Sequence, residues 1–96
     1  MPQTNVRVPQ ITSVKTAIRL FYEKIEIGNQ DILTLFGKMG GRKILLLKRA
    51  AKEQMDEDEV PNMNALYVNT KSAYKAWGLD IKDLKERYRE LKKLDA

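Results

Sequence analysis

The sequence predicts an all-α domain of about five helices, and three observations favour this fold class. Apolar residues recur at intervals of three and four along most of the chain, whereas strand-like alternation is lacking outside one short run. Glycine, proline and asparagine separate these periodic segments, where helices have to end. The chain has 96 residues, of which 43% are hydrophobic and 32% charged. This length and composition allow one small buried core and a single domain.

The first part of the chain divides into an arm and a helix. Residues 1–11 are polar, contain two prolines and one charged residue, Arg7, and are expected to form a flexible N-terminal arm. Such an arm could place its arginine in a DNA minor groove, but a frayed terminus is the simpler interpretation. Thr12 and Ser13 can cap a helix that ends near Gly28. The apolar face of this helix consists of Val14, Ala17, Ile18, Phe21 and Ile25.

Two further helices are predicted next, separated by a glycine-rich turn. The first opens at Asn29, has Asp31 in its first turn where the helix dipole favours negative charge, and closes at Gly37. The second runs from about Gly41 to Met55. Three helices over residues 12–55 are expected to close a core that consists of Ile18, Phe21, Ile25, Ile32, Phe36, Ile44, Leu47 and Ala51.

The other side of the helix that follows Gly41 is basic. Because glycine has no Cβ, Gly40 and Gly41 would let a phosphate approach the free N–H groups at the start of this helix. Cations opposite an apolar stripe are typical of a helix that lies on nucleic acid. The predicted DNA-binding residues are Gly40, Gly41, Arg42, Lys43, Leu45, Lys48, Arg49 and Lys52. Arg42 and Arg49 are expected to contact base edges, because a guanidinium can bond guanine at two points.

The stretch IGNQDILTLFGKMGGRKILLLKRA resembles the helix-turn-helix of small DNA-binding proteins from phages and mobile elements. In that family a D-I-x-x-L-F-G helix leads through a short turn to a basic helix, and Gly37 matches the turn. Leu33 stands where alanine is commonest, and Gly40 and Gly41 replace the customary Ser or Thr, so phosphate contacts there would come from the backbone.

The resemblance implies sequence-specific binding of double-stranded DNA, with transcription regulation in a phage or mobile element as the expected role. Two alternatives remain open. One is a helix-turn-helix-like adaptor for protein interaction, which Leu45 and Leu46 favour because they add apolar surface around the basic helix. The other is an accessory role in phage DNA packaging or recombination.

Composition bears on both partners and chemistry. Lys and Arg number 18 against 13 Asp and Glu, which gives a net charge of +5 and a pI near 9.5 and favours polyanionic partners. The chain contains no Cys and no His, so it lacks disulfides, the usual zinc ligands and the commonest general base. We therefore expect no enzyme activity, no cofactor and no metal. No apolar run is long enough for a membrane span or a signal peptide, so a cytoplasmic location is the default expectation.

Two stretches are similar to ligand-binding motifs but lack features that those motifs require. Residues 56–59 are all acidic, but they lack the glycine of a calcium loop and are interpreted as a solvated acidic loop. The stretch GKMGGRK has the wrong glycine spacing for a phosphate-binding loop and is not followed by Ser or Thr. Neither motif changes the expectation of a non-enzymatic protein.

Residues 56–69 are predicted to form a loop that contains Pro61. Its apolar run, residues 65–68, could be a strand or a docked loop, and the lack of an evident partner strand favours the docked loop. Asn69 or Thr70 can then cap a short helix that Gly78 ends. Trp77, within this helix, is expected to anchor it to the core rather than to stack on a base.

The final predicted helix is capped by Asp80 and runs from Ile81 to about Leu94, within a helical extension that covers residues 70–96. Its apolar residues alternate by three and four, as in a coiled coil. They are Ile81, Leu84, Tyr88 and Leu91, and they are the predicted contact of a homodimer. The same stripe could instead fold back on its own domain.

Overall fold

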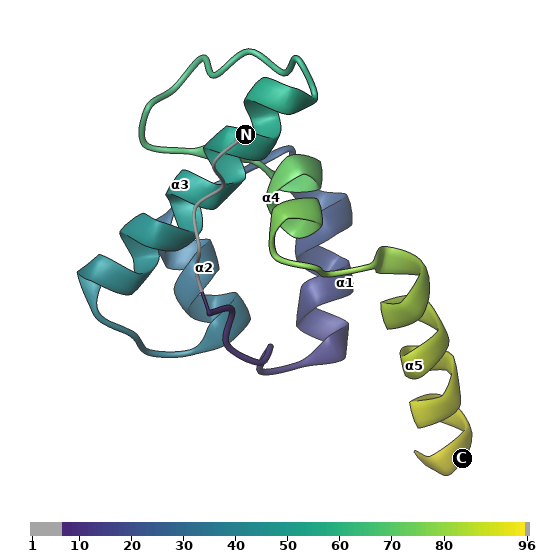
Figure 1. Cartoon of the computed structure of the whole chain (residues 1–96). Helices are drawn as coiled ribbons and strands as arrows, with labels where there is room; N and C mark the ends of the chain where they lie inside the picture. The colour runs from purple at the N-terminus through teal and green to yellow at the C-terminus, as the bar shows by residue number, and fades with distance from the viewer. Residues whose placement is uncertain (1–6, 96) are drawn as a thin grey trace.

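The computed structural model describes residues 7–95, which form five α-helices and one two-stranded antiparallel sheet. In chain order the elements are α1 (Val14–Glu23), β1 (Glu26–Ile27), α2 (Asn29–Phe36), α3 (Gly41–Glu57), β2 (Val68–Asn69), α4 (Thr70–Ala76) and α5 (Ile81–Asp95). Figure 1 shows α1 to α4 gathered into one body, from which α5 extends. The mostly helical architecture agrees with the predicted fold class, and the small sheet is an addition to it.

Helix α1 begins as predicted but ends earlier. The hydroxyl of Ser13 accepts a hydrogen bond from the backbone N–H of Thr16 at 3.3 Å and caps the helix start. The helix ends at Glu23 rather than near Gly28, because the next residues are held in an extended conformation by Thr70. Its hydroxyl donates to the carbonyl of Lys24 at 2.6 Å, and its N–H donates to the carbonyl of Ile25 at 2.9 Å.

The early end of α1 changes which residues enter the core. Ile25, predicted to be in the core, lies in the connection before β1 and is 82% exposed, whereas Ile27 of β1 is fully buried. Ile18 and Phe21, two other predicted core residues, are half-buried at the edge of the core.

The two strands pair with Glu26 opposite Asn69 and Ile27 opposite Val68. The expectation of a docked loop up to Val68 is therefore wrong at its last residue, as is the expectation that extended structure is confined to that region. The partner strand lies in a segment that was assigned to the first helix. The alternation of Ile25, Glu26 and Ile27 is the sequence signal that could have revealed it.

Helices α2 and α3 have the predicted starts. The N–H of Gly28 donates to the carboxylate of Asp31 at 3.0 Å, which fixes the first turn of α2. At the end of α2, Gly37 has φ of 91° and ψ of −177°, a conformation that essentially only glycine adopts. After the turn, α3 begins at Gly41. Ile44, Leu47 and Ala51 are buried as predicted, and Met55 continues the same buried stripe.

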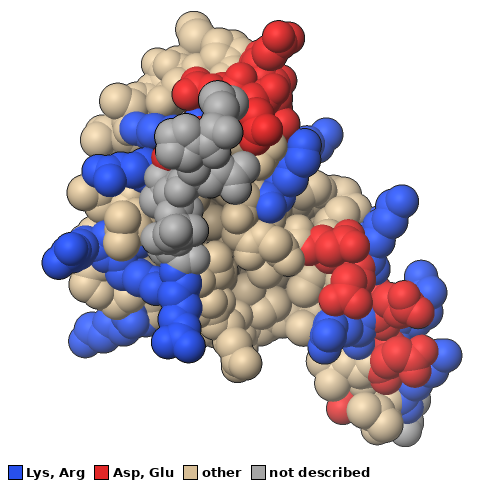
Figure 2. All heavy atoms as spheres, viewed as in Figure 1, with Lys and Arg blue, Asp and Glu red and all other residues tan. Residues whose placement is uncertain are grey.

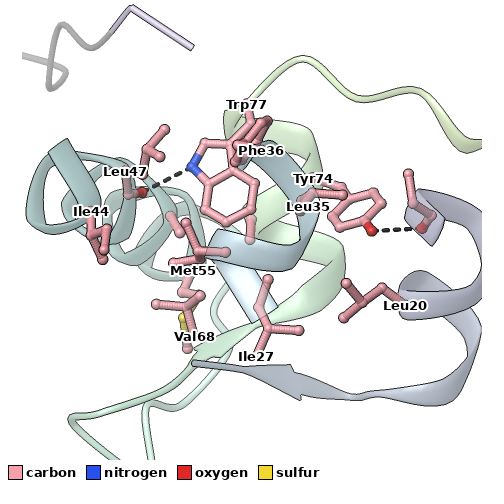
Figure 3. Close-up of a cluster of buried hydrophobic side chains, with 14 of the residues drawn as sticks. Leu20, Ile27, Leu35, Phe36, Ile44, Leu47, Met55, Val68, Tyr74 and Trp77 are labelled. Carbon is pink, nitrogen blue, oxygen red and sulfur yellow. Dashed lines mark hydrogen bonds between the residues drawn. The ribbon is translucent and has the colours of Figure 1, made fainter. Parts of the chain in front are cut away.

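The centre of the core is built around two aromatic residues at α4 (Figure 3). The indole N–H of Trp77 donates to the carbonyl of Leu47 in α3 at 2.9 Å, and the hydroxyl of Tyr74 donates to the carbonyl of Ala17 in α1 at 2.6 Å. The Trp77 ring also packs edge-on against Phe36, with 5.4 Å between ring centroids. Helix α4 thus bridges α1 and α3. The predicted core of three helices is incomplete without it.

Both ends of the described chain lie partly on this core. Of the predicted arm, residues 1–6 are outside the described residues, while Val8 and Ile11 are half-buried against the core. At the other end, Leu84 of α5 is only 5% exposed, and α5 packs mainly on α1. None of the helices within residues 7–95 has the length and hydropathy that crossing a membrane requires.

Candidate nucleic-acid interface

Helix α3 turns one face to α4 and the opposite face to solvent. Because Leu47 and its buried neighbours face the core, Arg42, Leu45 and Arg49 are directed outward, three and four residues apart. Both arginines are exposed, and Leu45 is 57% exposed. Trp77 bonds the middle turn of α3 and thereby fixes the direction in which these side chains project.

The turn before α3 continues the same surface. Gly40 and Gly41 are exposed, and a Cβ added at either would meet no atom within 4 Å, so packing does not require glycine there. Lys38 is exposed in this turn, and Lys43 is half-buried in the first turn of α3. We define the α3 basic surface as these residues with the outward face of α3. Its members are Lys38, Gly40, Gly41, Arg42, Lys43, Leu45 and Arg49.

Figure 2 shows basic side chains gathered on the left of the molecule, over the region where α3 begins in Figure 1. Among residues 7–95, no carboxylate forms an ion pair with any of the four cations of this surface. Several cations elsewhere do pair, including Lys24 with Asp31 and Lys75 with Asp58. The α3 basic surface therefore presents positive charge that the described part of the chain does not neutralise.

Lys48 and Lys52, which were predicted to bind DNA, have a structural task. The Nζ atom of Lys48 donates to the carbonyl of Leu66 at 2.9 Å and to the side-chain oxygen of Asn29 at 3.0 Å. That of Lys52 donates to the carbonyl of Ala65 at 2.9 Å. The two lysines therefore fasten the loop before β2 onto α3. Burial of the ammonium group, followed by the charge of Lys52, lowers the pKa of Lys48.

The charges along α3 run against its helix dipole. The first turn contains no acid and the last turn no base, whereas Asp56 and Glu57 lie at the C-terminal end. A helix start favours negative charge and a helix end positive charge, each by roughly 0.3–1 kcal/mol when exposed. A bound anion at the start of α3 would relieve the unfavourable placement of Arg42 and Lys43. Only this first half of α3 suits a polyanion, because acidic side chains gather near its end (Figure 2).

The acidic segment after α3 is organised by hydrogen bonds. The carboxylate of Asp58 accepts from Ser72 at 2.9 Å, from Lys75 at 3.1 Å and from the amide of Gln54 at 3.0 Å. The Lys75 hydrogen bond, with those from Gln54 and Ser72, lowers the pKa of Asp58. This carboxylate ties the end of α3 to α4. Among the described residues, no group of three or more potential metal ligands occurs.

Lys38 was not among the predicted DNA-binding residues. It is exposed and lies between two glycines of the turn that leads to the predicted basic helix. Its position in that turn was the available signal, since the turn brings it beside the start of α3. Of the eight predicted residues, the structure groups six in the α3 basic surface and separates Lys48 and Lys52 as loop anchors.

The predicted dimer contact is divided between two environments. Ile81 is half-buried and Leu84 buried within the single chain, Tyr88 is half-buried, and Leu91 is 45% exposed. Beyond them, Leu94 is 82% exposed. A single chain therefore covers the first part of this stripe and leaves the distal part open.

Comparison of the chain with protein-family models, with curated proteins and with solved structures gives no match.

Proposed function

We propose that the protein binds double-stranded DNA through the α3 basic surface. The observation that carries the proposal is the group of cations that have no carboxylate partner within residues 7–95, at the exposed start of a helix whose back is fixed to the core. An α-helix fits the major groove of B-form DNA, and phosphates are the ligands that such a surface attracts. The role we propose is transcription regulation, as the resemblance to small phage and mobile-element regulators suggests.

The surface supports a division of labour among its residues. Gly40 and Gly41 leave room for a phosphate at the helix N-terminus, and Lys38 and Lys43 would flank it with positive charge. Arg42 and Arg49 are two turns apart on the outward face, roughly 10 Å along the helix axis. They could therefore reach base pairs about three steps apart, because successive pairs rise by about 3.4 Å.

A selection from random duplexes, followed by fluorescence-anisotropy titration, tests this proposal. The preferred duplex is expected to lose affinity steeply as salt increases. Replacing Arg49 with Ala should cost roughly 1–3 kcal/mol on that duplex and less on random DNA. Lys43→Ala should weaken both duplexes alike and lower the salt slope by about one unit. Absence of binding at low salt would refute the proposal.

A protein-interaction adaptor is the second candidate, and exposed apolar residues favour it. Leu45 is 57% exposed. Leu66 is 70% exposed and lies in the loop that Lys48 and Lys52 hold beside α3. In an adaptor these apolar side chains would form the centre of the contact and the cations its rim. Leu45→Ser would then impair function more than Arg49→Ala, the reverse of the order expected for DNA binding.

We also propose that DNA is bound by a homodimer whose contact includes the distal part of α5. Leu91 and Leu94 favour this arrangement, because they remain exposed after Leu84 has packed on α1. Two copies would add their base contacts and would discriminate the spacing of two half-sites.

A further inference from the structure

A second candidate surface lies along α1 and α4. It consists of two adjoining hollows of about 470 and 560 Å³, and Phe21 and Lys71 line both of them. Volumes of this size are typical of sites that receive apolar groups. We call this surface the α1–α4 groove. Its apolar part consists of Phe21, Tyr22, Ile25, Leu79 and Ile81.

The apolar part of the groove is unusually open to solvent. Ile25 is 82% exposed and Tyr22 58% exposed, and both line the larger hollow. Ile25 is exposed because Thr70 pulls the chain out of helix after Glu23. Single exposed apolar residues are common, but two that line one hollow make it a candidate interaction site.

Lysines surround this apolar surface. Lys24, Lys71 and Lys75 line the hollows, and the Nζ atom of Lys85 lies 5.0 Å from the centre of the Tyr22 ring. Within residues 7–95, Lys71 forms no ion pair or side-chain hydrogen bond, while Lys24 and Lys75 remain half or more exposed beside their carboxylate partners. Among the described residues, Asp80 is the one carboxylate that lines the groove, and it accepts a hydrogen bond from the N–H of Lys82 at the start of α5.

We propose that the α1–α4 groove binds an acidic segment of a partner protein. Apolar side chains of that segment would fill the hollows beside Phe21 and Ile25, and its carboxylates would face Lys71 and Lys75. Charge complementarity determines the sign of the partner, and the apolar hollows determine that it is a peptide segment. The phosphate backbone of DNA carries no apolar group that could fill them. This inference does not depend on DNA binding by α3.

Selection from a random-peptide display library against the immobilised full chain tests the inference. Enriched peptides are expected to combine acidic and large apolar residues. Their affinity, measured by fluorescence anisotropy, should fall with increasing salt. Lys71→Glu should weaken binding about tenfold, because it places like charges together. Ile25→Ser should also weaken binding about tenfold, because it removes an apolar side chain from the contact.

Two matched variants control for general effects. Met63→Ser removes an apolar side chain that is 84% exposed, but from the loop between α3 and β2. Lys15→Glu makes the same charge change as Lys71→Glu, at the exposed start of α1. Both controls should bind the enriched peptides within about twofold of wild type. Circular dichroism and the thermal midpoint are expected to be unchanged in all four variants, because the altered residues are exposed.

Several outcomes would overturn the inference. These are no enrichment, enrichment of peptides without acidic residues, or equal peptide binding by wild type and the Lys71→Glu and Ile25→Ser variants. Self-association that Ile25→Ser abolishes would assign the groove to a second copy of the chain. Duplex DNA that displaces the peptides and loses affinity in Lys71→Glu would assign it to nucleic acid.

Discussion

Helices α3 and α5 are both long, cationic and amphipathic, yet the molecule uses them differently. Helix α3 buries its apolar stripe from Ile44 to Met55, whereas α5 buries only Leu84 and leaves Leu94 open. Helix α3 is also bonded to other elements at its middle through Trp77 and near its end through Asp58. Helix α3 is therefore the one that the fold holds rigidly.

The two helices also differ in how far their basic side chains are paired with carboxylates. On α5, Arg87 pairs with Asp83 and Lys93 with Glu90, so part of its positive charge is neutralised locally. At the start of α3, Arg42 and Lys43 have no carboxylate partner among the described residues. A net positive surface on a rigid helix can hold a ligand in one orientation. A locally balanced surface on a protruding helix serves solubility or self-association better.

The largest expected effect separates the two apolar stripes. Leu47→Ala should lower the free energy of unfolding by about 2–5 kcal/mol, because this leucine is fully buried and its truncation leaves a cavity in the core. Leu91→Ala should change it by less than about 0.5 kcal/mol, because this leucine is 45% exposed. Denaturant unfolding followed by the fluorescence of Trp77, the only tryptophan, measures both variants. Equal losses would contradict the account of α3 as the more deeply packed helix.

The second prediction concerns the attachment of α4 to α1. Burial raises the pKa of Tyr74, so folding favours its neutral hydroxyl. That contribution to stability is fully present below the unfolded pKa, near 10, and is lost as pH rises towards the folded pKa. Tyr74→Phe should cost about 0.5–1.5 kcal/mol at neutral pH, because it removes the hydrogen bond to Ala17.

Unfolding of wild type and Tyr74→Phe at neutral pH and at pH above 10 measures this contribution. The difference between them should shrink at the higher pH, because only the wild type has a buried hydroxyl there to lose its proton. A difference that stays constant would show that the hydroxyl is not held neutral by the fold.

How far the sequence predicted the structure depended on how local each determinant is. Gly37, Asn69 and Gly78 mark helix ends through their own backbone or side chain, and the predicted ends at these residues are confirmed. The end of α1 depends on Thr70, which is distant in sequence, and was therefore missed.

The candidate site shows the same limit. Helical periodicity correctly predicted which residues of α3 face away from the core. It did not predict that Lys48 and Lys52 meet the loop before β2, because periodicity gives the face of a helix but not its neighbour. The bridging position of α4 was missed for the same reason, although Trp77 was expected to anchor it to the core.

The smallest effect on stability is expected at the end of α5, where self-association should change instead. Replacing Leu91 and Leu94 with Asp should leave the thermal midpoint nearly unchanged, because both leucines are exposed in the single chain. If the distal part of α5 joins two copies, sedimentation equilibrium should show a dimer for wild type and a monomer for the variant. A wild-type protein that is monomeric with and without duplex DNA would remove the case for two half-sites.

The salt dependence of DNA binding tests the central claim about α3 most directly. A double variant, Lys38→Ala with Lys43→Ala, removes the two cations that would flank a phosphate at the start of α3, and its control, Lys82→Ala with Arg89→Ala, removes two from α5. Both proteins should be titrated with one duplex over a range of salt concentrations. We predict that the α3 variant loses about two units of salt slope and that the α5 variant keeps the wild-type slope. Equal slopes for the two variants would contradict the assignment of DNA binding to the α3 basic surface.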